Sequence, residues 1–264
     1  MSKRPVVSLT TIVKDAANLL PDMIRSVRGV ADEIVLVVDA GTIDDTRVVA
    51  HKLGAKTVEF EWCDDFAKAR NFGIDHCRGE WILVLDADDR LLPLGRTVIQ
   101  RCVGWGMAKL REIGAIGYQF VIDERNLDGT SRGLAISSGR LFPRRNSLRY
   151  VGRVHEEVRY LPEPKAGKWA RVGDGPDMFH IGYDPSLMPG KYARNERLLK
   201  LRLDDDPTDL WAYFYLAKQY ELEGRLGEAQ MAAERALHLD DEKDEMLREH
   251  VEAMFAIYRR ALAR

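Results

Sequence analysis

The chain has 264 residues, an apolar fraction of 45% and a formal net charge of −2. This length allows one large α/β domain, or a moderate domain with a small appendage. The small net charge excludes a general attraction to nucleic acid or to an anionic membrane surface.

Strand and helix patterns alternate over the first hundred residues. Apolar runs predict four strands, at residues 6–13, 33–39, 56–60 and 81–85. Helical periodicity predicts three helices between them, at residues 19–27, 46–53 and 66–76. Asp65 is a candidate cap for the third helix. This order predicts parallel strands with right-handed crossovers in a doubly wound sheet.

The pattern changes after a predicted helix at residues 97–111. Residues 114–123 and 134–142 read as two strands around a glycine-containing loop, which predicts an antiparallel extension of the sheet. Residues 150–161 and 177–183 read as short, irregular strands. From residue 189 the pattern is wholly helical, so we expect an α/β domain over residues 1–188 and a helical region over 189–264.

Small and large apolar residues alternate across residues 211–237, with a turn at 223–225. This arrangement resembles a tetratricopeptide repeat, flanked by half-units at 191–203 and 242–260. The aromatic stripe of Trp211, Phe214 and Tyr215 is expected in the core rather than in a binding groove. A homodimer formed through the helical region is a candidate assembly.

The sequence pattern contains no targeting signal, and its cysteines bear on the redox environment of the protein. No apolar run approaches the ~20 residues needed to span a bilayer, and no signal-peptide pattern follows the first residue. The three cysteines are odd in number and widely spaced, which indicates reduced thiols rather than a disulfide framework or a zinc site. We therefore expect a cytoplasmic protein without a membrane span.

Asp86 and Asp88 directly follow the buried fourth strand. In open α/β sheets, ligands bind beyond the carboxyl ends of the strands. Two carboxylates at this spacing can bind a divalent cation, which often accompanies phosphate groups. An isolated Asp-x-Asp pair is more often a solvated acidic turn that caps the next helix.

Other polar residues lie at neighbouring strand ends, so they should converge with this acidic pair. They are Thr10, Thr11 and Lys14 after the first strand, Asp39 and Asp44 after the second, and Lys68 and Arg70 before the fourth. Taken singly, Asp44 could cap a helix, and the two cations could lie on a solvated helix face. Together they offer carboxylates for a nucleoside and a metal, and cations for phosphates. The glycine-rich dinucleotide and P-loop patterns are missing, which disfavours NAD binding and ATP hydrolysis.

These segments resemble family 2 glycosyltransferases with the GT-A fold. The resemblance rests on residues 37–46, 69–71 and 85–89, and it spans roughly residues 5–183. Two later segments, 152–156 and 179–183, are similar to a bacterial subgroup with tetratricopeptide-like helices. That subgroup includes peptide S-glycosyltransferases of the sublancin type. The resemblance implies a Rossmann-like, doubly wound mixed sheet with a small helical extension.

The resemblance also implies roles for individual residues in binding a nucleotide-sugar. Asp39 would contact the base beside the backbone of Thr10 and Thr11, and Asp88 would bind the metal. Asp86 would contact either ribose or metal. The polar shell of the nucleotide would comprise Asp44, Lys68 and Arg70. The chain departs from the family at residues 14–16 and 42–45, so the nucleoside contacts stay open there.

Sugar transfer also needs a base that takes a proton from the acceptor. Glu156 is the predicted base because it lies in the acceptor half, although it could be a surface glutamate beside Glu157. His180 is predicted to complete the metal shell, with a buried structural histidine as the alternative. His155 would orient Glu156 or touch the diphosphate, and it competes with His180 for the metal.

The sequence therefore predicts an inverting glycosyltransferase that depends on Mn²⁺ or Mg²⁺ and uses a nucleotide-sugar, with UDP as the expected nucleotide. A peptide or protein is the favoured acceptor by analogy with the fold, while saccharide and lipid-linked acceptors stay open. No nucleic acid partner is expected. The alternative is a catalytically silent scaffold that binds nucleotide and recruits a partner through its helices.

Overall fold

The computed structural model describes residues 6–126, 128–161, 165–181 and 188–239, with 256–257, 259–260 and 262–263 near the carboxyl end. The chain forms two compact units, Met1–Pro185 and Ser186–Arg264. The boundary proposed from the sequence, after residue 188, lies close to this division. Within the described ranges, none of the helices is both long and apolar enough to cross a membrane.

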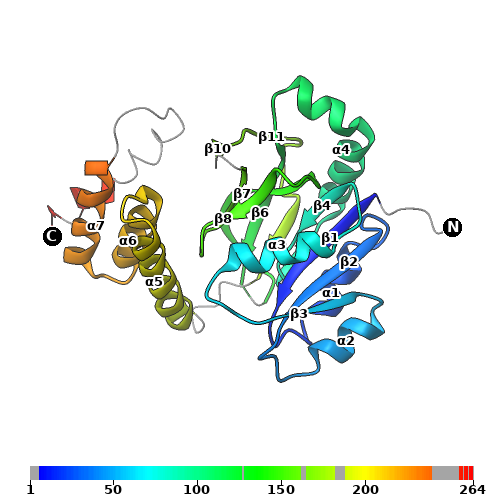
Figure 1. The fold of residues 1–264 in the computed structure, drawn as a ribbon, viewed down its shortest axis with the longest axis horizontal. Coiled ribbons are helices and arrows are strands. Elements are labelled where there is room, and N and C mark those ends of the chain that lie inside the picture. The colour runs from blue at the N-terminus through cyan, green and yellow to red at the C-terminus, as the bar shows by residue number, and fades with distance from the viewer. Residues whose placement is uncertain are drawn as a thin grey trace. The chain divides into compact units, whose positions relative to one another are not determined.

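The first unit begins with four parallel strands (Figure 1). They lie in the order β3 (Lys56–Phe60), β2 (Glu33–Asp39), β1 (Val7–Val13) and β4 (Trp81–Val84). The helices between them are α1 (Leu20–Ser26), α2 (Thr46–Lys52) and α3 (Phe66–His76). The predicted alternation of strand and helix is confirmed, with the bounds of β2, β3 and α3 as predicted.

Strand β4 is buried on both faces, as its apolar run predicts. Trp81 and Leu83 belong to the apolar cluster that contains residues of α1, while Ile82 and Val84 belong to the cluster that contains residues of α3. The two faces of the sheet are therefore both covered by helices. This arrangement directs the residues that follow β4 to the carboxyl edge of the sheet.

Helix α3 lies very close to the sheet. A Cβ atom at Gly73 would stand 2.3 Å from Thr10 Oγ1 and 2.8 Å from Val37 Cγ2, so only glycine permits this approach. At the other end, the Asp65 side chain accepts a hydrogen bond from Lys68 N at 2.9 Å. The predicted cap is confirmed, and it fixes the turn that carries Arg70.

The other half of the sheet is mixed. Beyond β4 it continues through β7 (Ser131–Pro143), β6 (Gly117–Arg125), β12 (Met178–His180) and β5 (Asp89–Leu91), and β11 (Trp169–Arg171) pairs with β6. β7 is antiparallel to both β4 and β6, which confirms the predicted extension. Helix α4 (Pro93–Glu112) is interrupted at Gly106, whose φ is 69°. The sequence did not predict β5.

The sheet curls so that β5 returns toward β4. In a flat sheet, the four strand spacings between β4 and β5 would amount to about 19 Å. Only four residues connect the two strands, and they turn back through a hydrogen bond from Asp89 N to Asp86 O at 3.0 Å. Because that connection is too short for a flat sheet, curling places both strands beside the acidic triplet of Asp86, Asp88 and Asp89.

A small second sheet consists of β8 (Leu148–Val151), β9 (Glu157–Tyr160) and β10 (Lys165–Ala166). The prediction of one irregular strand over 150–161 is wrong, because the backbone turns between β8 and β9. Gly152 and His155 both have positive φ, 100° and 52°. A hydrogen bond from Phe66 N to Arg153 O at 2.8 Å fastens this turn to the start of α3.

The second unit contains α5 (Met188–Asp205), α6 (Leu210–Leu222) and α7 (Leu226–Leu239). The predicted turn at 223–225 separates α6 from α7. Phe214 and Ala236 form an apolar cluster against which Trp211 and Tyr215 pack, in agreement with a core position for the aromatic stripe. The predicted half-unit at 242–260 falls almost entirely outside the described residues.

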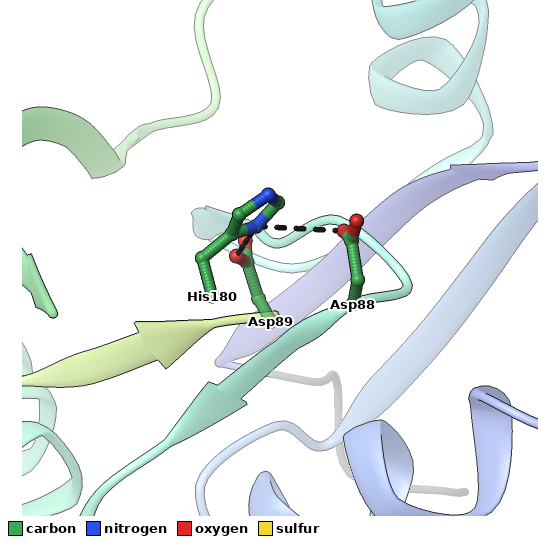
Figure 2. Close-up of side chains that lie close together, drawn as sticks. All are labelled: Asp88, Asp89 and His180. Atoms are coloured by element: carbon green, nitrogen blue, oxygen red, sulfur yellow. Dashed lines mark hydrogen bonds and ion pairs between the residues drawn. The ribbon is translucent and has the colours of Figure 1, made fainter. Parts of the chain in front are cut away.

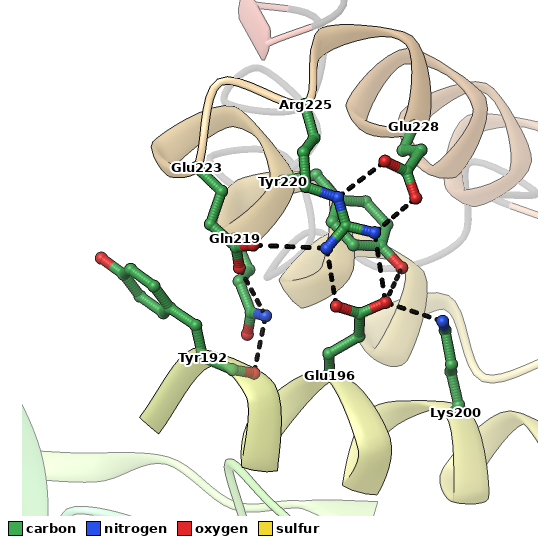
Figure 3. A network of polar contacts seen from close by, with 8 residues as sticks. All are labelled: Tyr192, Glu196, Lys200, Gln219, Tyr220, Glu223, Arg225 and Glu228. Carbon is green, nitrogen blue, oxygen red and sulfur yellow. Dashed lines mark hydrogen bonds and ion pairs between the residues drawn. The ribbon is translucent and has the colours of Figure 1, made fainter. Parts of the chain in front are cut away.

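A polar network joins the three helices of this unit around Arg225 (Figure 3). Arg225 Nη1 lies 2.6 Å from Glu196 Oε2 and 3.2 Å from Glu223 Oε2, and Nη2 pairs with Glu228. Glu196 also accepts from Lys200 Nζ at 2.7 Å. Because Glu196 lies on α5 and Arg225 precedes α7, the network fixes α5 against the α6–α7 hairpin.

Glu196→Gln should reduce the free energy of unfolding by about 1–2 kcal/mol at pH 7. Hydrogen bonds from Arg225, Lys200 and Tyr220 outweigh burial and hold the pKa of Glu196 at about 2, against an ordinary value of 4.5. The stabilisation is therefore complete above pH 4.5 and is lost as the pH falls toward 2. Urea denaturation followed by circular dichroism should show that the difference in unfolding free energy between wild type and Glu196→Gln is smaller at pH 3 than at pH 7.

Glu234→Gln is the matched control, since Glu234 is exposed on α7 and accepts a hydrogen bond from Gln230. It should change the unfolding free energy by less than about 0.5 kcal/mol. A loss for Glu196→Gln that is equally large at both pH values would contradict the electrostatic explanation.

Candidate active site

Strands β5 and β12 bring the acidic triplet next to a histidine 91 residues further along the chain. The two strands are antiparallel, and Asp89 lies opposite His180 in the register. Ile181 N continues the pairing by donating to Asp88 O at 3.1 Å. The sheet register therefore sets the meeting of these residues.

Asp88, Asp89 and His180 form a group that could hold a metal ion. His180 Nδ1 lies 2.8 Å from Asp89 Oδ1 and 3.5 Å from Asp88 Oδ1, and Figure 2 shows both contacts meeting at the same ring nitrogen. Each residue offers one ligand atom, and the three atoms lie within 4.8 Å of one another. Two ligands of one ion at about 2.2 Å are at most about 4.4 Å apart, so Asp88 and His180 meet the geometric requirement.

Asp89 has a structural task in addition to its place in this group. It is completely buried, and its Oδ2 accepts a hydrogen bond from Asp86 N at 2.8 Å. Arg140 Nη2 lies 3.5 Å from the same oxygen. Asp89 therefore closes the turn after β4 and orients the imidazole of His180.

Burial lowers the pKa of His180, but the hydrogen bond to Asp89 and the charges of Asp88, Asp89 and Asp86 outweigh it. The pKa is consequently raised above its ordinary value of 6.5. A cation bound through this imidazole would compete with its proton, so affinity for the cation should weaken on acidification.

Asp86 is oriented differently from the other two acids. Its Oδ1 accepts from Arg70 Nη2 at 3.0 Å, and its Oδ2 lies 3.5 Å from Arg140 Nη1. Burial raises the pKa of Asp86, but the two guanidinium groups outweigh burial and hold it well below its ordinary value. Asp86 is thus ionised, and the group of three possible ligands does not include it.

Glu156, the predicted base, binds the same arginine as Asp86. Its Oε1 accepts a hydrogen bond from Arg70 Nε at 2.5 Å, and 11% of its side chain is exposed. Within the described part of the chain, this arginine is its one hydrogen-bond partner. Glu156 thus has a second oxygen on which a proton could be accepted.

The predicted nucleotide residues gather at the ends of β1 and β2. Lys14 Nζ lies 3.6 Å from Asp39 Oδ2, and Gly41 N donates to Asp39 Oδ1 at 2.7 Å. Thr10 and Thr11 lie within β1 with buried side chains, and they lie opposite Val35 and Leu36 of β2 rather than opposite Asp39. Asp39 and Lys14 are therefore brought together.

Asp44 and Lys68 are engaged in local structure. The Asp44 carboxylate accepts from Ala17 N at 3.0 Å, from Thr46 N at 2.9 Å and from Thr46 Oγ1. These bonds fix the entry to α2, whose N-cap residue is the neighbouring Asp45 and not Asp44. Lys68 is exposed and lies 3.7 Å from Asp65 Oδ2. Contact of either residue with a nucleotide stays a prediction.

His155 is exposed, and its backbone is left-handed. Of the two candidate histidines, the possible metal group contains His180. The last two residues of the signature at 179–183 lie outside the described residues. Sequence reasoning missed Arg140, because an arginine within β7 carries no local signal of what it faces.

A family model described as Glycosyl transferase family 2 matches residues 8–104. The chain is 32% identical over 236 residues to a TPR repeat-containing protein of Synechococcus elongatus, covering 85% of this chain and 54% of the relative. It is 23% identical over 219 residues to the SPbeta prophage-derived glycosyltransferase SunS of Bacillus subtilis, covering 81% of this chain and 49% of the relative. The chain thus spans about half the length of these two relatives.

Among solved structures, S. aureus TarS 1-349 aligns with a TM-score of 0.52 and 14% identity, covering 97% of this chain and 90% of that chain. At this identity the likeness shows a shared fold. The family model covers the chain from β1 into α4, including the acidic residues after β4. Over these residues the chain is therefore similar to glycosyltransferase family 2, in a fold shared with TarS, and the helices α5, α6 and α7 follow.

Proposed function

We propose that this protein is an inverting, metal-dependent glycosyltransferase that uses a UDP-linked sugar. The observation that carries the proposal is the group of Asp88, Asp89 and His180 at the carboxyl edge of the sheet. Carboxylate and imidazole ligands suit Mn²⁺, and carboxylates suit Mg²⁺. A divalent cation held there would offset the charge that develops on the departing diphosphate.

The donor nucleotide would lie along the ends of β1 and β2. Asp39, fixed by Gly41 N and Lys14, offers a carboxylate to the base. The Lys14 amino group is more than half exposed and is available to a phosphate oxygen. This arrangement supports nucleotide binding across the first two strands.

Glu156 would act as the base in a single displacement. The acceptor nucleophile attacks the anomeric carbon of the sugar as the bond from that carbon to the diphosphate oxygen breaks. The proton of the nucleophile passes to Glu156, and the nucleotide diphosphate leaves. Because one displacement occurs at the anomeric carbon, its configuration inverts.

The acceptor is proposed to be a peptide or protein with a cysteine, serine or threonine nucleophile. The tetratricopeptide-like helices support this class, since such repeats provide extended binding surfaces. Cys63, Cys77 and Cys102 are all free thiols, which supports a cytoplasmic location.

A panel of nucleotide-sugars tests the proposal by nucleotide release with Mn²⁺ or Mg²⁺, before and after chelation. We expect release from at least one UDP-sugar, loss on chelation and recovery when metal is restored. Intact-mass analysis of peptide acceptors then identifies transfer. A well-folded protein that binds UDP but releases nucleotide from no donor would favour the scaffold function instead.

A further inference from the structure

Asp86 is the acid of the triplet whose surroundings differ most from those of a metal ligand. Its two oxygens face Arg70 Nη2 at 3.0 Å and Arg140 Nη1 at 3.5 Å. Both guanidinium groups are buried, with 12% and 11% of their side chains exposed. A divalent cation on either oxygen would stand beside a buried positive charge, which disfavours binding there.

Arg70 contacts Asp86 and Glu156 with one edge of its guanidinium group. Nη2 donates to Asp86 Oδ1, and Nε donates to Glu156 Oε1 at 2.5 Å. These two nitrogens lie on one edge of the rigid, planar guanidinium group. A carboxylate that binds one nitrogen therefore also fixes the direction in which the other nitrogen points. Nη1, at the opposite edge, is buried without a hydrogen-bond partner in the described part of the chain.

The backbone around Arg70 is fixed independently of the two carboxylates. Asn71 exchanges two hydrogen bonds of 2.9 Å with the backbone of Tyr150, whose ring centroid lies 5.5 Å from Arg70 Cζ. Phe66 N at the start of α3 binds Arg153 O. Helix α3 thus carries the arginine and also anchors the turn that leads to Glu156.

From this geometry we propose that Asp86 is a positioning residue for the base and not a ligand of the cation. Asp86 holds Arg70 in the orientation that fixes Glu156, while Arg140 binds Asp86 and Asp89 from the other side. The cation is left to Asp88, His180 and the Oδ1 atom of Asp89, which faces His180 and not Arg140. The inference rests on the proposed function, because it takes Glu156 as the base.

Asp86→Asn removes the charge and preserves the size, so it separates the two roles. We expect its Kd for Mn²⁺, titrated by electron paramagnetic resonance, to stay within about threefold of wild type, while kcat falls about 10- to 100-fold. Asp88→Asn should weaken Mn²⁺ binding at least about tenfold in the same titration. Glu157→Gln is the control for a carboxylate beside Glu156 that is 44% exposed, and it should change neither quantity.

A double-mutant cycle with Arg70→Lys tests whether Asp86 acts through Arg70. Lysine keeps the charge but cannot bridge both carboxylates, so Asp86→Asn should cost little further activity in that background. Circular dichroism and thermal melting establish whether each variant is folded. If Asp86→Asn is not folded, Arg70→Lys provides a second way to measure how the link between Asp86 and Glu156 affects kcat.

Three results would overturn the inference: loss of Mn²⁺ affinity in Asp86→Asn as large as in Asp88→Asn, an unchanged kcat, or additive losses in the double variant. The proposed function fails separately, when the wild-type protein turns over no donor. In that case the role as positioning residue for a base falls with it, and the Mn²⁺ titration still decides whether Asp86 is a ligand.

Discussion

Asp88→Asn is expected to abolish chelator-sensitive nucleotide release, with kcat lower by about 10³-fold or more. Asp88 offers a carboxylate oxygen 3.5 Å from His180 Nδ1, and an amide in its place binds a divalent cation far more weakly. Without the cation, charge on the departing diphosphate would have to be offset by lysine and arginine side chains alone. Stopped assays of UDP release at saturating donor and Mn²⁺ measure the effect.

Asp75→Asn is the matched control for Asp88→Asn. Asp75 is exposed near the end of α3 and pairs with Arg149, so its loss should leave kcat within about twofold. If the Asp88→Asn variant still released nucleotide, and chelation still abolished that release, the cation would have to be bound elsewhere. That result would contradict the assignment of Asp88 as a ligand.

Glu156→Gln is expected to lower kcat by about 10²- to 10⁴-fold while leaving the affinities for Mn²⁺ and UDP nearly unchanged. Glutamine can still accept a hydrogen bond from Arg70, so the local packing around α3 is retained. It cannot take a proton from the acceptor, and the loss should therefore appear in kcat. Transfer to a peptide acceptor and calorimetric titration with UDP separate the two effects.

Glu157→Gln provides the control at the neighbouring position, where the carboxylate lies 3.3 Å from Arg159 in strand β9. A kcat close to wild type in Glu156→Gln would remove its role as the base. A large loss of UDP affinity in that variant would instead place Glu156 on the donor side.

The sequence alone determined the parallel half of the fold. Each signal there is local: the apolar run of β4, the cap at Asp65, and the helical spacing over 66–76 all act within about ten residues. Because the strands are parallel, their carboxyl ends share one edge, so the meeting of Lys14 after β1 with Asp39 at the end of β2 also followed. The family resemblance rested on these same segments.

The partners of each acid were decided by the tertiary structure. Strands β5 and β12 have three residues each, too few for a periodic pattern, and their pairing depends on how the sheet curls. That register brings His180 to Asp89, which the sequence did not identify as a possible metal ligand. Likewise, the positive φ of His155 divides what the sequence presented as one strand.

The charges around Asp86 show the same division between local and long-range information. The sequence predicted Arg70 near phosphates and Asp86 near ribose or metal. The residue type and the position near a strand end were the only information available for that prediction. The structure places Asp86 between Arg70 from α3 and Arg140 from β7, 16 and 54 positions away along the chain. Local patterns thus determined which elements form and which acids reach the edge of the sheet. Long-range packing decided which charge each acid faces. The physical reason is that a buried carboxylate must be paired by whatever cation the fold brings beside it.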